Sequence, residues 1–524
     1  MKQKTEKQYR GALHEYRWLL FIAAVVLAAL FSFYNLGGRS ISRADESLYA
    51  RSVQEMLRGG SWIPTLHGSP FLHKPPLTQI LISFAVALAG DATWVFRVPS
   101  AVAGFLYLLL VPLFAHRLFH SVSAAVFSFF AILSCKMLFS SHLLREATPD
   151  AMLVLFLLVG LTLVWELCRQ LVSTQELSRR ALFLSGFFGL SVLLALLVKS
   201  VAGLLSLIVW WLWILAYRRS VLVPFKRVVI VSLVTTIAPV TLFAAGYLAL
   251  LNAVPGTFGA AVHYEVVEKL LGEGHHNTDL SYYYFSQLFV HGRAFPVVAL
   301  VVALVFGLRK ALRGDVRYAY LTMAIFAPLC GYSFLHSRLY WYIAPIFAPC
   351  AILLGDLCGS CLVVAKSANR RLQHRVVAAL CGLLVAVQLG RNVAAVVNRQ
   401  LFTQQRMKLE TTILELIAAK KSDPHLRIVK LCLDPTDPYF KSLLLREWFY
   451  LDMLYPVSVS VCEISDVQDK LSASGATIVV TAPHLEKLLP QNIKVLERSA
   501  VRVDRWKGIT KPDRVKELVF LRLG

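Results

Sequence analysis

The 524-residue chain is poor in charged residues and lacks the common nucleotide-binding and hydrolase motifs. Asp, Glu, Lys and Arg make up 16% of it, against about 25% in a typical soluble domain. We find no phosphate-binding loop of the G-x-x-x-x-G-K-[ST] type, no Gly-rich dinucleotide fingerprint and no G-x-S-x-G elbow. These absences argue against ATP-driven transport and against serine hydrolysis.

The sequence also lacks clustered cysteines. Its nine cysteines are scattered singly, except for Cys358 and Cys361, which share one apolar run. A zinc site needs four converging ligands, and neither a second cysteine pair nor a nearby histidine accompanies these two. We therefore interpret them as core residues.

Apolar residues dominate instead. They account for 57% of the chain, and the mean hydropathy is +0.61, which predicts a polytopic α-helical membrane protein. The net charge of +23 would also suit a nucleic-acid-binding protein. However, the basic residues fall in short clusters between apolar runs, as in the cytoplasmic loops of membrane proteins, so we expect no nucleic acid partner.

The distribution of charge predicts a topology. A basic segment precedes the apolar run Trp18–Leu36, and no small-residue cleavage site follows it, so we expect an uncleaved first span with a cytoplasmic N-terminus. Further spans are predicted at 98–116, 122–141, 151–168, 181–198, 201–217, 228–250, 288–308, 318–335, 340–363 and 376–394. Every dense basic loop then lies in the cytoplasm.

This scheme requires that residues 75–90 do not cross the membrane. The segment is too short for a full span and is predicted to be an interfacial helix within a first periplasmic loop, 37–97. The total is about 11 to 13 membrane helices.

The chain changes character near Asn398. Short strands are predicted at 427–433, 457–461, 476–481 and 517–523, with helical patterns at 407–420, 439–450 and 465–474. We therefore expect a membrane domain over 1–398 and a small periplasmic α/β domain over 399–524.

The first loop holds the best candidates for chemistry. Asp45 and Glu46 begin a helical pattern, with Arg43 and Tyr49 beside them and Lys74 before a double proline. Ser42 and the acids could simply cap the helix, but capping would explain only one acid. It does not explain why several charged residues lie together in a loop against lipid, where uncompensated charge is costly. An Asp in this setting can accept a proton from a hydroxyl, and a Lys held by two prolines can neutralise a phosphate leaving group.

Other ionisable residues are predicted on the same side. Arg145, Lys199 and Arg338 would suit a phosphate on a lipid carrier, although Arg145 and Lys199 also fit snorkelling anchors. Asp150 would add a second acidic position. Glu265, His263, His275 and His276 are possible ligands of a divalent metal.

The order of motifs resembles a known family. D-E-x-x-Y-A, W-I-P-x-x-x-G-x-P, K-P-P-L, F-R-V-P-S-A-V-A-G, R-x-x-x-x-D and S-x-x-x-S-R-L-x-x-Y-x-x-P occur in succession between residues 45 and 345. This series is similar to the bacterial lipid-linked glycosyltransferases of the GT-C fold. The group includes the 4-amino-4-deoxy-L-arabinose transferases of lipid A and bacterial relatives of the dolichyl-phosphate-mannose protein O-mannosyltransferases.

The resemblance implies inverting transfer of a sugar from undecaprenyl phosphate, on the periplasmic face of the inner membrane, to a lipid, glycan or protein. It makes Asp45 the key acid, places the donor phosphate at Lys74 and Arg338, and lines the pocket with Tyr49, Asp150 and Tyr342. The chain departs from the aminoarabinose transferases at Leu48, His73, Arg338 and Ser200–Val201, where they have Arg, Glu, Lys and Gly-Pro, respectively.

We thus predict a polyprenyl-phosphate-dependent glycosyltransferase. The alternative is a transporter or flippase for a lipid-linked sugar, which would need charged residues at mid-membrane and on the inner half. Few are present there.

Overall fold

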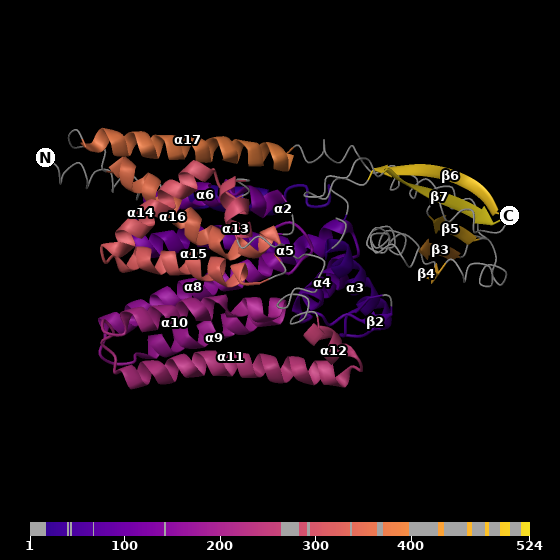
Figure 1. Cartoon of the computed structure of the whole chain (residues 1–524), viewed down its shortest axis with the longest axis horizontal. Helices are drawn as coiled ribbons and strands as arrows, with labels where there is room; N and C mark the ends of the chain where they lie inside the picture. The colour runs from indigo at the N-terminus through magenta and orange to yellow at the C-terminus, as the bar shows by residue number, and fades with distance from the viewer. Residues whose placement is uncertain are drawn as a thin grey trace.

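A computed structural model of the chain describes residues 17–38, 41, 45–66, 68–140, 143–263, 282–290, 294–335, 338–363 and 370–397, together with five strands between 428 and 523. Figure 1 shows a long helical bundle and a separate sheet. The bundle comprises α2 (Arg17–Phe33), α5 (Thr93–Phe119), α6 (Val122–Leu133), α8 (Asp150–Ser173), α9 (Arg179–Lys199), α10 (Leu205–Tyr217), α11 (Phe225–Ala253), α14 (Val297–Leu312), α15 (Val316–Ser333), α16 (Phe347–Val363) and α17 (Arg370–Val397).

Several of these helices can cross a bilayer. Among the described residues, five helical stretches are long and apolar enough by length and composition: Thr93–Phe119, Asp150–Ser173, Arg179–Tyr217, Phe225–Ala253 and Tyr340–Gly359. Each span predicted from the sequence overlaps helical residues, and most of them coincide with a single helix. The chain is a multi-pass membrane protein, and its predicted helical fold class is confirmed.

The predicted span 122–141 is interrupted. α6 ends at Leu133, and a short helix, α7 (Lys136–Ser140), follows. The Ser134 hydroxyl donates to the carbonyl of Ala131, and the Lys136 amide donates to the carbonyl of Ala294. The helix ends here because the Lys136 amide donates to a carbonyl outside it rather than to the carbonyl four residues earlier.

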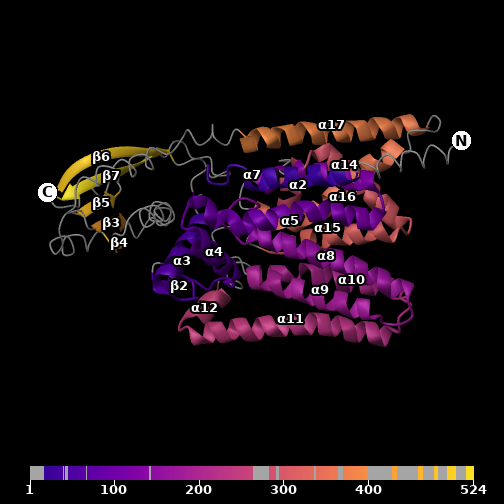
Figure 2. The ribbon, with the colours of Figure 1, turned by 180° about the vertical axis from the view of Figure 1, so that it is seen from behind.

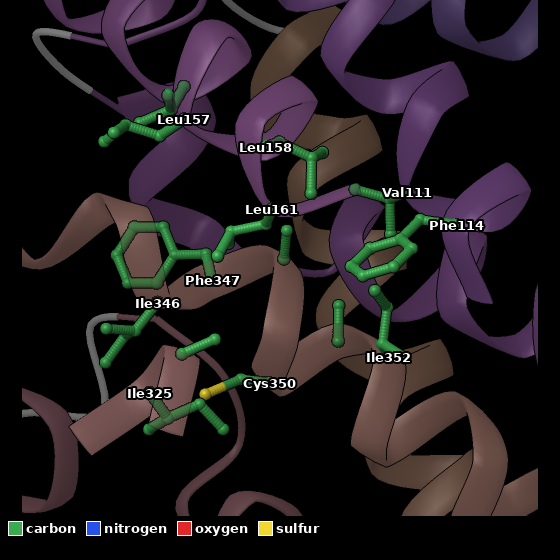
Figure 3. Packing of buried hydrophobic residues seen from close by; sticks show 14 of the residues in the cluster. Val111, Phe114, Leu157, Leu158, Leu161, Ile325, Ile346, Phe347, Cys350 and Ile352 are labelled. Atoms are coloured by element: carbon green, nitrogen blue, oxygen red, sulfur yellow. The ribbon is translucent and has the colours of Figure 1, made fainter. Parts of the chain in front are cut away.

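The core lies where α5, α8, α15 and α16 meet. Figure 3 shows Val111 and Phe114 of α5 against Leu158 and Leu161 of α8, with Ile352 of α16 close by. Small residues bring α6 and α16 together: a Cβ added at Gly355 would lie 2.4 Å from the backbone nitrogen of Ser128. Close backbone approach of this kind is typical of helix packing within membranes.

Short elements gather at one end of the bundle. These are α3 (Asp45–Gly59), the hairpin of β1 (Thr65–Leu66) and β2 (Ser69–Pro70), α4 (Leu77–Ala89), η1 (Ser200–Leu204), α12 (Thr257–Val262), α13 (Tyr283–Phe285), η3 (Ser286–Val290) and η4 (Tyr340–Ile346). Figures 1 and 2 both show α3, α4, β2 and α12 side by side at that end. At 13 residues, α4 is roughly 20 Å long, too short to cross about 30 Å of hydrocarbon. Its interfacial placement stays a prediction.

The strands after residue 427 form one mixed sheet in the order β4-β3-β5-β7-β6. They are β3 (Ile428–Leu433), β4 (Ser458–Glu463), β5 (Thr477–Thr481), β6 (Ile493–Arg502) and β7 (Val515–Leu523). β3 is parallel to β4 and β5, whereas β7 is antiparallel to β5 and β6. Four of the strands were predicted from the sequence and β6 was not. The predicted helices between them, and the boundary near residue 398, lie outside the described residues.

Candidate functional site

A buried ion pair marks the centre of the candidate site. Lys199 Nζ lies 2.5 Å from Asp150 Oδ1, and both side chains are buried. Asp150 is the first residue of α8 and Lys199 is the last of α9. Because the two helices are consecutive and antiparallel, these residues meet at the same end of the bundle. Each charge also complements the dipole of its own helix terminus.

Residues from other segments converge on this pair. Lys199 interacts electrostatically with Asp45 and Lys74 as well as with Asp150. Its ammonium also lies 4.8 Å from the ring centroid of Tyr342, which is a cation–π distance. The structure thus brings together Asp45, Lys74, Asp150, Lys199 and Tyr342, all predicted as candidates from the sequence.

An aromatic series connects this cluster to Arg338. The ring centroids of Tyr342 and Tyr332 are 5.7 Å apart, and those of Tyr332 and Tyr284 are 6.3 Å apart. Arg338 donates to the carbonyl of Ser333 at 3.0 Å and interacts electrostatically with Tyr284. Burial raises the pKa of Tyr284 well above its usual value, so its hydroxyl stays protonated. Sequence reasoning did not single out Tyr332 as a candidate.

The loop that carries Lys74 is fixed from the opposite side. The Tyr247 hydroxyl on α11 donates to the carbonyl of Leu72 at 2.6 Å. Leu72 packs with Leu251, Val254 and Ala261 of α11 and its following turn and helix. Tyr49 is buried, with its ring 6.4 Å from that of Phe71. Lys74 and Asp45 themselves are half-buried.

Glu46 has a different environment from Asp45. It is completely buried, and both of its carboxylate oxygens accept from Arg97, at 2.6 and 3.0 Å. Oxygen Oε1 also accepts from the Ala147 amide at 3.0 Å, and Arg97 donates to the carbonyl of Leu36 at 2.8 Å. This arrangement joins α3 to α5. It gives Glu46, which we predicted to be catalytic, the contacts of a structural residue.

Arg145 also makes structural contacts. Its guanidinium donates to the carbonyls of Phe31 at 2.8 Å and of Tyr34 at 2.5 Å. These carbonyls belong to the end of α2 and the turn after it, where the helix has no acceptors for its last C=O groups. Arg145, predicted as a cation for the carrier phosphate or as a snorkelling anchor, therefore caps a helix.

Some predicted residues cannot be placed. Arg43, Glu265, His275 and His276 lie outside the described residues. No group of three or more His, Cys, Asp or Glu suitable for a metal occurs within the described part of the chain.

Ser200 follows the ion pair in an unusual backbone conformation. Its φ is +42° and its ψ is −127°, a region that favours glycine. The hydroxyl is buried and has no hydrogen-bond partner among the described residues.

We expect Ser200→Gly to stabilise the protein by about 1 kcal/mol, because it relieves backbone strain and removes little bonding. Thermal unfolding of the purified full-length protein in detergent measures the effect. Ser134 also ends a helix but has a φ of −76°, so Ser134→Gly should give no gain. A melting temperature lowered by Ser200→Gly would contradict the expectation.

Comparison with known proteins finds a mannosyltransferase family model and sugar transferases that resemble this chain. Residues 73–243 match the family model of dolichyl-phosphate-mannose-protein mannosyltransferases. An undecaprenyl phosphate-alpha-4-amino-4-deoxy-L-arabinose arabinosyl transferase from Shewanella sediminis is 27% identical over 61% of this chain. That match spans 56% of the relative, and a similar transferase from Erwinia tasmaniensis is matched over 57% of its length. The chain thus spans little more than half the length of these curated relatives.

Solved structures extend the likeness over the whole chain. ArnT from Cupriavidus metallidurans, in a crystal structure bound to undecaprenyl phosphate, aligns with a TM-score of 0.66 over 97% of this chain and 98% of its own, at 17% identity. The archaeal oligosaccharyltransferase AglB from Archaeoglobus fulgidus aligns at 0.50 over 72% of this chain and 56% of its own, at 14% identity. At these identities the likeness shows the fold. This chain has the fold of the GT-C glycosyltransferases, as the motifs predicted.

Proposed function

We propose that this chain is an inverting glycosyltransferase that moves a sugar from an undecaprenyl (polyprenyl) phosphate carrier to an envelope acceptor, such as lipid A, another glycan or a protein. The observation that carries the proposal is the gathering of Asp45, Lys74, Asp150 and Lys199 at one end of an apolar bundle. Charged side chains within a membrane bundle are costly unless they are ion-paired or take part in binding or catalysis. Relatives named as undecaprenyl-phosphate-sugar transferases support the choice.

The cations provide a site for the carrier phosphate. Lys74, Lys199 and Arg338 carry three positive charges, whereas Asp45 and Asp150 carry two negative ones. A phosphate held between this cluster and Arg338 would meet one more positive charge than negative. As the bond between the anomeric carbon and the phosphate oxygen breaks, the phosphate leaves with the bonding electrons. Lys74 and Lys199 stabilise the charge that grows on it.

Asp45 is the proposed proton acceptor. An acceptor hydroxyl attacks the anomeric carbon from the face opposite the phosphate, and its proton passes to the Asp45 carboxylate. A single displacement of this kind inverts the anomeric configuration. Asp150 positions Lys199 through their ion pair and is therefore a positioning residue. Tyr342 and Tyr49 line the pocket, with Tyr342 also against the Lys199 ammonium.

The proposed location is the bacterial inner membrane, with a cytoplasmic N-terminus and with the site and the C-terminal sheet in the periplasm. The clusters at Arg179–Arg180, Arg218–Arg219 and Arg309–Lys310 lie at the ends of helices, and the positive-inside rule puts them in the cytoplasm. Figure 1 shows the sheet beyond the end that carries α3 and α4. Reporter fusions at residues 220 and 450 test this placement, since they should report opposite sides.

A transfer assay in membranes with defined undecaprenyl-phosphate sugars tests the function. The expected result is a glycosylated acceptor and free undecaprenyl phosphate. Movement of an intact lipid-linked sugar across the membrane without transfer would instead support a transporter.

Within that assay, Lys74→Ala should lower the kcat/KM for the donor by about 10²-fold, the usual effect of removing one group that stabilises transition-state charge. Arg58→Ala is the matched control, because Arg58 is an exposed cation in the last turn of α3. Equal kcat/KM values for Lys74→Ala and the wild type would remove Lys74 from the site.

A further inference from the structure

An apolar groove runs between α9 and α11, away from the candidate site. Its volume is about 590 Å³. The lining is almost entirely aliphatic, and Arg227 supplies its one guanidinium among the lining residues. Figures 1 and 2 both show α11 on the outer side of the bundle, next to α9. In a membrane this groove therefore opens toward lipid.

Small residues create the groove. A Cβ added at Gly186 would meet no atom within 4 Å, and one at Gly189 would meet only the Thr235 carbonyl oxygen, at 3.9 Å. Leu182, Leu190 and Leu193 flank these glycines on α9, and Val234, Ala238 and Leu242 line the opposite wall on α11. The space has the length and polarity of a hydrocarbon chain, because its walls extend from Arg227 to Leu242 along 15 residues of helix, roughly 22 Å.

One end of the groove is strongly basic. Arg227 lines it, Lys226 is adjacent in sequence, and Arg179 and Arg180 begin α9 at the same end. Arg180 contacts Glu166 at 3.9 Å, whereas no ion pair within the described part of the chain involves Arg227. The guanidinium of Arg227 is exposed and available to an anion.

We propose that this groove binds an anionic glycerophospholipid, with one acyl chain between α9 and α11 and the phosphate on Arg227. The charge at the groove's end matches such a headgroup, and a guanidinium can bind phosphate through two hydrogen bonds. The proposed headgroup position differs from that of the polyprenyl donor. The donor phosphate is placed at Lys199, roughly 30 Å of helix away from the basic start of α9, so the two lipids would have their phosphates at opposite ends of that helix. In the proposed topology, the lipid belongs to the cytoplasmic leaflet.

The test is lipid binding to the purified full-length protein, measured by native mass spectrometry. The probes are phosphatidylglycerol and phosphatidylcholine with identical acyl chains. Wild-type protein should bind phosphatidylglycerol more tightly. Arg227→Gln should weaken phosphatidylglycerol binding about fivefold, the contribution expected of one basic residue near a lipid phosphate. It should weaken phosphatidylcholine binding less, because the choline ammonium already offsets the charge of that lipid's phosphate. Gly186→Leu should weaken both lipids, because it fills the groove.

Matched controls separate the site from general effects. Arg219→Gln removes a cation at the same end of the bundle but outside the groove lining, and Gly246→Leu adds the same side chain to an open position on α11. Both should bind the two lipids as the wild type does. Equal binding of the two lipids by the wild type, unchanged binding in Arg227→Gln and Gly186→Leu, or displacement of phosphatidylglycerol by equimolar undecaprenyl phosphate would each overturn the proposal. These readouts do not depend on sugar transfer.

Discussion

Asp45→Asn is expected to lower sugar transfer by about 10² to 10⁴-fold, the range that a general base contributes. The amide is nearly the same size as the carboxylate but cannot take a proton from the acceptor. Asp45 starts α3 and is half-buried beside the Lys199–Asp150 pair, so the substitution removes one negative charge from the cluster and leaves the packing of α3 intact. The measurement is the kcat of the transfer assay at saturating donor.

Two controls make the result specific. Asp91→Asn alters an exposed acid after α4 and should transfer at the wild-type rate. Thermal unfolding of Asp45→Asn should match that of the wild type within the error of the method. Full transfer by Asp45→Asn would exclude proton acceptance by this residue, and a large loss of stability would attribute its effect to folding.

Hydrophobic length and charge placement were enough to predict the bundle. Runs of about 20 apolar residues have one stable solution in lipid, because every backbone polar group must be paired within the helix. The interruption at Ser134 was not predictable in this way, since it depends on a hydrogen bond from Lys136 to the distant carbonyl of Ala294. β6 was missed for a related reason. Its residues carry charges among the apolar positions, and its pairing with β7 is a tertiary property.

The sequence predicted individual residues of the candidate site, but it did not predict which of them contact one another. Lys199 and Asp150 were separate candidates, and their contact follows from the antiparallel turn of α8 and α9. Adjacent acids posed a harder problem. Asp45 and Glu46 differ by 100° around a helix, and the sequence does not show which face is buried. The partner of Glu46 lies 51 residues away, at Arg97 in the F-R-V-P motif, and only the fold places it there.

Of the substitutions proposed here, Arg97→Gln should lower the free energy of unfolding most, by about 3 to 5 kcal/mol. It leaves the Glu46 carboxylate buried without its ionic partner. The pair is buried: the Arg97 side chain is 3% exposed and that of Glu46 is 0% exposed. A loss of this size is a large part of the 5 to 15 kcal/mol that stabilises a typical protein. Thermal unfolding in detergent, together with the yield of monodisperse protein, measures it.

The double variant Glu46→Gln with Arg97→Gln distinguishes a buried charge from a simple loss of contacts. With neither charge present, the desolvation cost disappears, and the double variant should be more stable than Arg97→Gln alone. Arg169→Gln breaks the half-exposed pair with Glu166, 3.6 Å apart, and should cost no more than about 1 kcal/mol. If the double variant were no more stable than Arg97→Gln, the hydrogen-bond geometry that joins α3 to α5, rather than the unpaired charge, would account for the loss. In either case, Glu46 fixes the first turn of α3, and through it the position of Asp45.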